Sequence, residues 1–447
     1  MHKFTVNDSK FLFDENTNSL HEIDQLVWDL LEVGSLQQDA VLAVLADRYP
    51  ADELVQALQE LDQLRQAGLL FTEPVPPPTI PLDERPLVKA LCLHLAHDCN
   101  LRCVYCFAGT GAFGGSRELM PLSVGKAALD MLVQTSGTRR HLEVDFFGGE
   151  PLLNFPVVQE LVTYGRELER RTGKVFRFTL TTNATLLTAE VQEFLNFEKI
   201  AVVLSLDGRP EVNDYARPYP DGEGSYQTIV SDMQQFAASR GHQNYYVRGT
   251  YTHFNLDFAA DVIHMAELGF KHLSMEPVVG SPSEAYTLKP GDMPQLMSEY
   301  DRLADYYVNR HQIGQPFTFF HFNLSLDHGP CAVKRVTGCG AGYDYLAVTP
   351  SGDLYPCHQF VGQTDFRLGT VFDGILKPDI SRQFQSVNLY SKQGCSNCWA
   401  RFFCSGGCMA HAWFANGDFT KPELMACALQ KKRLECALYV QAKTTAH

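Results

Sequence analysis

The chain has 447 residues, too many for one ordinary hydrophobic core, which predicts two or three domains. Hydrophobic residues make up 45% and charged residues 20%, and the sequence has no apolar run of about 18 residues and no apolar leader after Met1. We therefore expect a cytoplasmic protein that has no membrane partner. A net charge of -15 argues against nucleic acid as a partner, because binding to phosphates requires a basic surface.

Residues 1–74 predict a small module of three strands and three helices. Short alternating runs at 2–6, 10–15 and 19–23 are separated by Asn-rich turn signals, which is typical of strands. Patterns of helical period follow at 21–33, 37–49 and 51–68. Prolines then concentrate within 72–86, where they forbid regular hydrogen-bonded structure. Residues 75–87 are therefore predicted to be a linker.

Residues 88–315 alternate between strand-like and helical patterns. Six strand patterns, each followed by a helical pattern or a loop, predict a parallel α/β sheet, either open or curled into a partial barrel. Functional groups are then expected at the carboxyl ends of the strands. Residues 316–447 are rich in loops and hold nine of the 13 cysteines. This last segment needs something other than a hydrophobic core to order it.

Three cysteines, Cys99, Cys103 and Cys106, follow the first predicted strand with the spacing C-x3-C-x2-C. In a reducing compartment such thiols are available for metals or catalysis. A structural zinc ion requires four ligands, so zinc here would need His94 or His97 to complete its shell. An iron-sulfur cluster held by three thiolates instead leaves one iron open for a small molecule. The missing fourth thiol favours the cluster.

The run C-N-L-R-C-V-Y-C-F, with Tyr105 before its third cysteine, resembles the radical SAM superfamily. The Gly148-Gly149-Glu150-Pro151 stretch after the second strand resembles the motif that receives the amino group of SAM in that family. Glycines allow close backbone approach, and an acid suits an ammonium group. The resemblance further implies that SAM is met by residues at the ends of the next three strands, namely Asn183, Ser205, Asp207 and Arg248.

This resemblance implies a partial (β/α)6 barrel, a 4Fe-4S cluster and S-adenosyl-L-methionine. One electron from a low-potential donor would cleave SAM, and the resulting 5'-deoxyadenosyl radical would abstract a hydrogen atom from the substrate. No further catalytic residue is assigned. Asp207 and the region of Glu276, expected on a helix, are interpreted as groups around the cofactor or as structural groups rather than as proton carriers.

The cysteine-rich segment resembles the SPASM domain, which implies two auxiliary 4Fe-4S clusters and three clusters in all. By this resemblance the nearer cluster uses Cys339, Cys357 and Cys408, with Cys331 either as fourth ligand or replaced by a substrate thiolate. The farther cluster is implied to use Cys395, Cys398, Cys404 and Cys427. The alternative is a pair of zinc sites, which would order the segment equally well. Cys92 and Cys436 lack motif partners and are predicted to be buried apolar residues.

The first module resembles a PqqD-like winged module, which accepts a leader peptide as an added strand at the edge of a sheet. A DNA-binding winged helix is the alternative, but the helix at 51–66 is acidic. The whole chain resembles maturases of SCIFF (ranthipeptide) precursors. This implies thioether crosslinks from cysteine sulfur to carbon in a ribosomally synthesised, Cys-rich peptide. Other readings are formylglycine formation in sulfatases, peptide epimerisation, and a non-catalytic, zinc-ordered peptide carrier.

Overall fold

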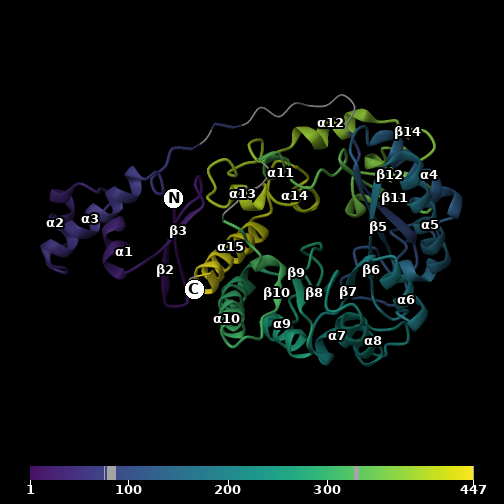
Figure 1. Cartoon of the computed structure of the whole chain (residues 1–447), viewed down its shortest axis with the longest axis horizontal. Coiled ribbons are helices and arrows are strands. Elements are labelled where there is room, and N and C mark those ends of the chain that lie inside the picture. Colours follow the sequence, from purple (N-terminus) through teal and green to yellow (C-terminus); the bar gives the residue numbers. More distant parts are fainter. Residues whose placement is uncertain (75, 78–86, 327–331, 446–447) are drawn as a thin grey trace.

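The structure is a computed structural model that describes residues 1–74, 76–77, 87–326 and 332–445. An eleven-stranded sheet runs through most of the chain, and six of its strands lie side by side in chain order (Figure 1). Each pairs in parallel with the next. These strands are β4 (Ala90–Ala96), β5 (His141–Gly148), β6 (Val175–Thr182), β7 (Ala201–Ser205), β8 (Tyr245–Tyr251) and β9 (His272–Pro277). The predicted α/β fold with a partial six-stranded parallel barrel is confirmed.

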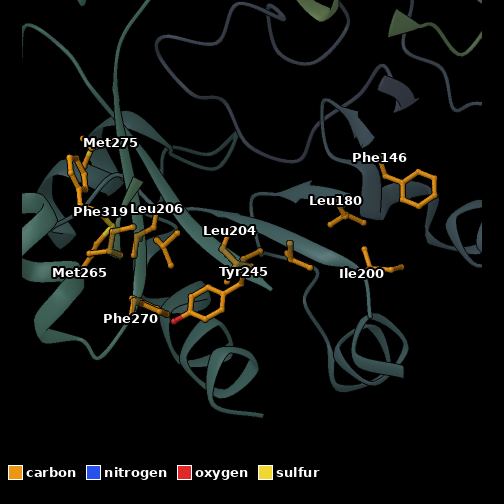
Figure 2. Close-up of a cluster of buried hydrophobic side chains, with 14 of the residues drawn as sticks. Phe146, Leu180, Ile200, Leu204, Leu206, Tyr245, Met265, Phe270, Met275 and Phe319 are labelled. Carbon is orange, nitrogen blue, oxygen red and sulfur yellow. The ribbon is translucent and has the colours of Figure 1, made fainter. Parts of the chain in front are cut away.

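Helices connect these strands and lie on the outer side of the curved sheet (Figure 1). They are α4 (Leu122–Thr135), α5 (Phe155–Thr172), α6 (Ala189–Phe197), α7 (Pro210–Ala216), α8 (Tyr226–Ser239) and α9 (Phe258–Glu267). Alternate strand residues such as Phe146 and Leu180 are buried between sheet and helices (Figure 2). Gly165 lets α5 approach the sheet, because a Cβ there would lie 2.6 Å from the Phe178 ring.

The sheet continues beyond residue 315. The short β10 (Thr318–Phe319) extends it beside β9, and β11 (Tyr345–Val348) pairs in parallel with β4 at the opposite side. Antiparallel β12 (Asp353–Tyr355), β13 (Gly369–Thr370) and β14 (Gly374–Ile375) follow. The cysteine-rich segment therefore shares its sheet with the barrel, which fixes its position relative to the β4 end.

Further helices complete the second half of the chain. They are α10 (Met293–Gln312), α11 (Ala332–Thr337), α12 (Pro378–Ser386), α13 (Arg401–Cys404), α14 (Met409–Asn416) and α15 (Leu424–Thr445). The long helix α15 packs against α10 and against the N-terminal strands (Figure 1). Across the described part of the chain, no helix combines the length and the apolar character that crossing a bilayer requires.

The N-terminal segment has its own small sheet. Antiparallel β1 (His2–Val6), β2 (Ser9–Asp14) and β3 (Ser19–Ile23) precede α1 (Gln25–Glu32), α2 (Gln38–Leu45) and α3 (Ala51–Gln66). One face of this sheet contributes Phe4, Phe11 and Phe13 to the main core. The other face contributes Leu12 to a separate core under the helices. The sheet is thus apolar on both faces, which anchors the helices to the rest of the molecule.

Polar and aromatic contacts join the N-terminal sheet to the cysteine-rich segment. The ring of His2 stacks on Trp399 with centroids 3.9 Å apart, and its Nε2 lies 2.8 Å from the Glu435 carboxylate. The buried Arg401 donates to Asn16 at 2.7 Å and to Glu15 at 3.3 Å. Because Trp399 directly follows Cys398 and Arg401 lies three residues after it, the sheet rests on a segment that bears predicted cluster ligands.

Trp399→Ala is expected to loosen this junction. Loss of the stacked indole should lower the free energy of opening of β1 by about 1–3 kcal/mol, because a large aromatic contact disappears. Hydrogen exchange of residues 2–6 should accelerate while β4–β9 stay protected. Trp413→Ala is the matched control, since Trp413 packs on Phe366 and Phe419 instead. Equal acceleration in both variants would contradict this account of the junction.

Candidate functional site

Three thiols gather on the loop between β4 and α4. Each of Cys99, Cys103 and Cys106 is partly buried, and each interacts electrostatically with another member of the set. Burial raises the pKa of Cys99 and of Cys103 to about 11, and it also raises the pKa of Cys106. Without a cation these thiols stay protonated. Iron would deprotonate them, so the donor set suits a metal cluster.

The alternative zinc site finds no support in the two nearby histidines. His94 and His97 hydrogen-bond to each other, with Nδ1 and Nε2 3.1 Å apart, and both rings lie against Phe113. Burial lowers the pKa of His97 to about 4. Within the described ranges, no three His, Cys, Asp or Glu side chains, those of the three-cysteine loop included, are positioned to hold a single metal ion. The ring contacts therefore give the two histidines a structural role in the barrel.

Two glycines bring the end of β5 against the cysteine loop. Gly148 has a φ of 128°, a conformation that favours glycine, and a Cβ on it would collide with the carbonyl of Ala96. A Cβ on Gly149 would collide with the carbonyl of Asp98. The Gly149 N–H donates to Ala96 at 2.8 Å and the Glu150 N–H to Asp98 at 2.9 Å. The glycines thus place Glu150 beside Cys99.

The Glu150 carboxylate is fully buried and held by three donors. It accepts hydrogen bonds from the Asn183 N–H at 2.8 Å, the Thr182 hydroxyl at 2.8 Å and the Leu152 N–H at 3.0 Å. Burial raises its pKa to about 7, while these donors act in the opposite direction. The Asn183 side chain donates toward the Cys99 sulfur at 3.6 Å. A buried acid beside a cluster ligand is a suitable partner for an ammonium group.

A second buried network braces the cysteine loop from the side of β7. The Tyr105 hydroxyl donates to Asp207 at 2.7 Å, and the Thr250 N–H donates to the other Asp207 oxygen at 3.0 Å. Arg217 donates to the Tyr105 oxygen at 3.1 Å. Both carboxylate oxygens of Asp207 are thus engaged. We therefore interpret Asp207 as a residue that positions Tyr105.

Arg217 is a site residue that the sequence analysis missed. It is buried, it interacts electrostatically with Cys103, and its Nε has no hydrogen-bond partner among the described residues. Backbone hydrogen bonds from Val104 to Ala216 and from Arg102 to Pro218 clamp it against the cysteine loop. Its positive charge favours thiolates and anions there. No local sequence signal marks it, because a single Arg after a short helix is ordinarily exposed.

Arg248 lies on β8 directly opposite Ser205 of β7. Its side chain helps to line a cavity of about 310 Å³, which also reaches Cys408 and Arg433. Glu276 lines the same cavity from strand β9, so its expected placement on a helix is wrong; its segment hydrogen-bonds in register to β8. Ion pairs with His321 at 3.0 Å and Arg433 at 3.1 Å hold the pKa of Glu276 well below its usual range, against the effect of burial.

The remaining predicted ligands form two groups. Cys357 and Cys408 interact with each other and with Cys339. A small hollow of about 30 Å³ is lined by the four other thiols, Cys395, Cys398, Cys404 and Cys427. The two groups contain the residues of the predicted nearer and farther sets, and cluster ligation by either set stays a prediction. Cys331 lies outside the described residues, and its role stays a prediction.

The two unassigned cysteines are buried, as expected. Cys92 is 1% exposed on β4 and Cys436 is fully buried on α15. Beside Cys92, inside the barrel, lies Asp145, which accepts a hydrogen bond from Thr179. Burial, and to a smaller extent Glu143, raises the pKa of Asp145 from 3.8 to about 6. Ionisation of this carboxylate therefore costs free energy in the folded protein.

Asp145→Asn is expected to stabilise the protein at pH 8 and much less at pH 4. The pKa of Asp145 in the folded protein lies above its unfolded value, so ionisation of Asp145 lowers the stability of the fold. This loss of stability is absent below about pH 4 and grows as pH rises to about 6, above which it is complete. Asparagine keeps an acceptor for Thr179 and should gain about 1–3 kcal/mol at pH 8. Thermal unfolding at both pH values measures this. Glu160→Gln, exposed on α5, is the control, and an equal gain at both pH values would refute the prediction.

The chain is similar to known proteins in sequence and in fold. The family described as a 4Fe-4S single cluster domain matches residues 89–231, which include the three-cysteine loop. The mycofactocin maturase MftC of Mycobacterium tuberculosis is 28% identical over 367 residues, covering 79% of this chain and 86% of MftC. The radical SAM cyclopropyl synthase TigE of Paramaledivibacter caminithermalis is 21% identical over 366 residues, covering 77% of this chain and 72% of TigE.

Among solved structures, anSMEcpe with bound AdoMet superposes with a TM-score of 0.65 at 21% identity, covering 78% of this chain and 96% of anSMEcpe. The chain therefore has the α/β fold of radical SAM enzymes. In sequence and fold the chain is thus similar to radical SAM/SPASM-type maturases.

Proposed function

We propose that this enzyme joins cysteine sulfur to carbon in a ribosomally synthesised, Cys-rich precursor peptide. The observation that carries the proposal is the cavity of about 310 Å³. It extends from Arg248, on the side of the proposed SAM site, to Cys408 of the nearer cysteine set. Cys404 and Cys427 of the farther set also line it. A peptide thiol bound there would lie beside the auxiliary cysteines, with Arg248 at the border of the cavity. In support, TigE is named as a cyclopropyl synthase, and anSMEcpe is known in a form with AdoMet and the Kp18Cys peptide.

We assign the residues around the first cluster as follows. Cys99, Cys103 and Cys106 would hold the cluster, and Glu150 would accept the ammonium of SAM. Arg248 would pair with its carboxylate, while Ser205 and Asn183 would border the bound nucleotide. When bound, SAM and its cluster supply a 5'-deoxyadenosyl radical that removes a substrate hydrogen atom.

The nearer set would act on the substrate thiol. Cys339, Cys357 and Cys408 supply three ligands, and a substrate thiolate would take the fourth position if Cys331 does not. Coordination removes the thiol proton and so activates the sulfur. Formation of each thioether releases one proton from the thiol, one hydrogen atom to the deoxyadenosyl radical and one electron. The auxiliary clusters would take up that electron and pass it to an external acceptor.

The N-terminal segment is proposed to bind the leader of the precursor. In the described residues β3 pairs with β2 on one side, so its other edge offers backbone groups to an added strand. The helix α3 of the same segment carries Asp52 and Glu53 in its first turn. We propose residues 1–74, 88–315 and 316–447 as three functional units, with residues 75–87 as the linker between the first two. An external low-potential reductant would supply the first electron.

Co-expression with a short Cys-rich peptide, to be sought among the reading frames that neighbour the gene, tests this proposal. Mass spectrometry of the peptide should show a loss of two hydrogens for each bridge, with that cysteine resistant to alkylation. The matched control is the enzyme with Cys99, Cys103 and Cys106 replaced by alanine. A peptide in which cysteine has become formylglycine would favour the sulfatase-maturase chemistry instead. An unchanged composition with inverted residues would favour epimerisation.

A further inference from the structure

Lys392 lies at the junction of the two auxiliary cysteine sets. Its side chain is only 4% exposed, although lysine is rarely buried. The ammonium group donates to the carbonyl oxygens of Gly406 at 2.8 Å and Gly407 at 3.1 Å. These glycines connect Cys404 of the farther set to Cys408 of the nearer set. Lys392 thus holds the short backbone bridge between the two sets.

The electrostatic surroundings of Lys392 include both sets. The ammonium interacts with Cys339 and Cys408 of the nearer set, and with Cys395 and Cys404 of the farther set. Within the described residues it forms no ion pair with an aspartate or glutamate. A buried charge needs compensation, and here the available anions are the thiolates of both sets. The carbonyl oxygens of Gly406 and Gly407 supply hydrogen bonds to Lys392 but no charge.

The backbone is shaped to admit this side chain. A Cβ on Gly406 would lie 3.0 Å from the Lys392 Cδ, tighter than ordinary packing allows, and Gly406 also has a φ of 78°. Ser405 before it is left-handed, with a φ of 57°. The turn between the two sets is therefore built around the lysine stem. Lys431, by contrast, is exposed on α15 and interacts with the farther set through Cys395 and Cys427.

We propose that Lys392 is a positioning residue shared by both auxiliary clusters, which fixes the bridge between them and whose charge favours their reduced states. This inference rests on the proposed function, because it requires that both sets hold iron-sulfur clusters. Clusters held by thiolates become more negative on reduction, and a fixed cation nearby raises their potentials. Both clusters would then be better able to take up the electron released on thioether formation.

Redox titration followed by electron paramagnetic resonance tests this inference. The background is the full chain with Cys99, Cys103 and Cys106 replaced by alanine, so that only the auxiliary clusters contribute. Lys392→Met should shift the midpoint potentials of both clusters to more negative values. Lys392→Arg, which keeps the charge, should stay near the parent. Lys431→Met is the matched control and should shift only the farther cluster, weakly, because its charge is screened by solvent.

Each outcome decides the inference. Parental potentials in Lys392→Met with full iron content, or a shift in one cluster only, would overturn it. If Lys392→Met loses iron, loss from both sets with retention in Lys392→Arg supports the shared role, and loss from one set only contradicts it. A parent protein without iron in these sets would instead refute the proposed function itself.

Discussion

Replacing Cys99, Cys103 and Cys106 together by alanine is expected to abolish the production of 5'-deoxyadenosine. The three thiols lie on one loop beside Glu150, and no other described cysteine joins them in that set. The variant should lose about four irons while both tail sets keep theirs. Deoxyadenosine measured by chromatography and iron measured by absorption together check this result.

The control for this variant is Cys436→Ala. Cys436 is fully buried on α15 and has its sulfur 3.7 Å from Asp301, away from every predicted ligand set. The Cys436→Ala substitution removes a thiol without removing a proposed ligand, so deoxyadenosine production should persist. SAM cleavage that survives in the triple variant would refute the assignment of the three-cysteine loop.

Gly149→Ala is expected to disable the same site through the backbone. Its Cβ would overlap the carbonyl of Asp98, which precedes Cys99, and backbone cannot give way as a flexible side chain can. Either the cysteine loop or the end of β5 must move. We expect SAM affinity to fall by at least about tenfold and stability to fall by about 2–4 kcal/mol. Equilibrium dialysis with SAM and thermal unfolding measure the two effects.

Gly115→Ala is the matched control for Gly149→Ala. It lies in the same connection between β4 and α4, and a Cβ there would meet the Ala112 carbonyl at an ordinary 3.5 Å. This variant should bind SAM normally. If both variants behave alike, the close approach of β5 to the cysteine loop is not what positions the site.

Local spacing made much of the site predictable from the sequence. The six parallel strands follow from alternating strand and helix patterns, whereas Glu150 was predicted from the resemblance of its stretch to a known family motif. Cys395, Cys398 and Cys404 are close in sequence, so their convergence needs little tertiary information. The resemblance to a known cysteine pattern then added Cys427, which reaches the same hollow from α15.

Contacts between distant segments could not be predicted in this way. Strand β11 pairs with β4 across more than two hundred residues, and this pairing merges the tail with the barrel sheet. The burial of Arg217 depends on backbone bonds to the cysteine loop. Lys392 is likewise an ordinary surface residue by sequence, and only the folded turn at Gly406 encloses it. Arg217 and Lys392 compensate charge in the interior, and their burial there depends on the whole fold.

The central claim is that the three-cysteine loop holds a cluster with one open iron. The most direct measurement is Mössbauer and electron paramagnetic resonance spectroscopy of anaerobically purified protein, with and without SAM. We predict about a dozen irons in three four-iron clusters, and a changed spectrum for one cluster when SAM is added. That change should vanish when Cys99, Cys103 and Cys106 are replaced. Colourless protein that contains zinc, or bound SAM that leaves every cluster spectrum unchanged, would contradict the account.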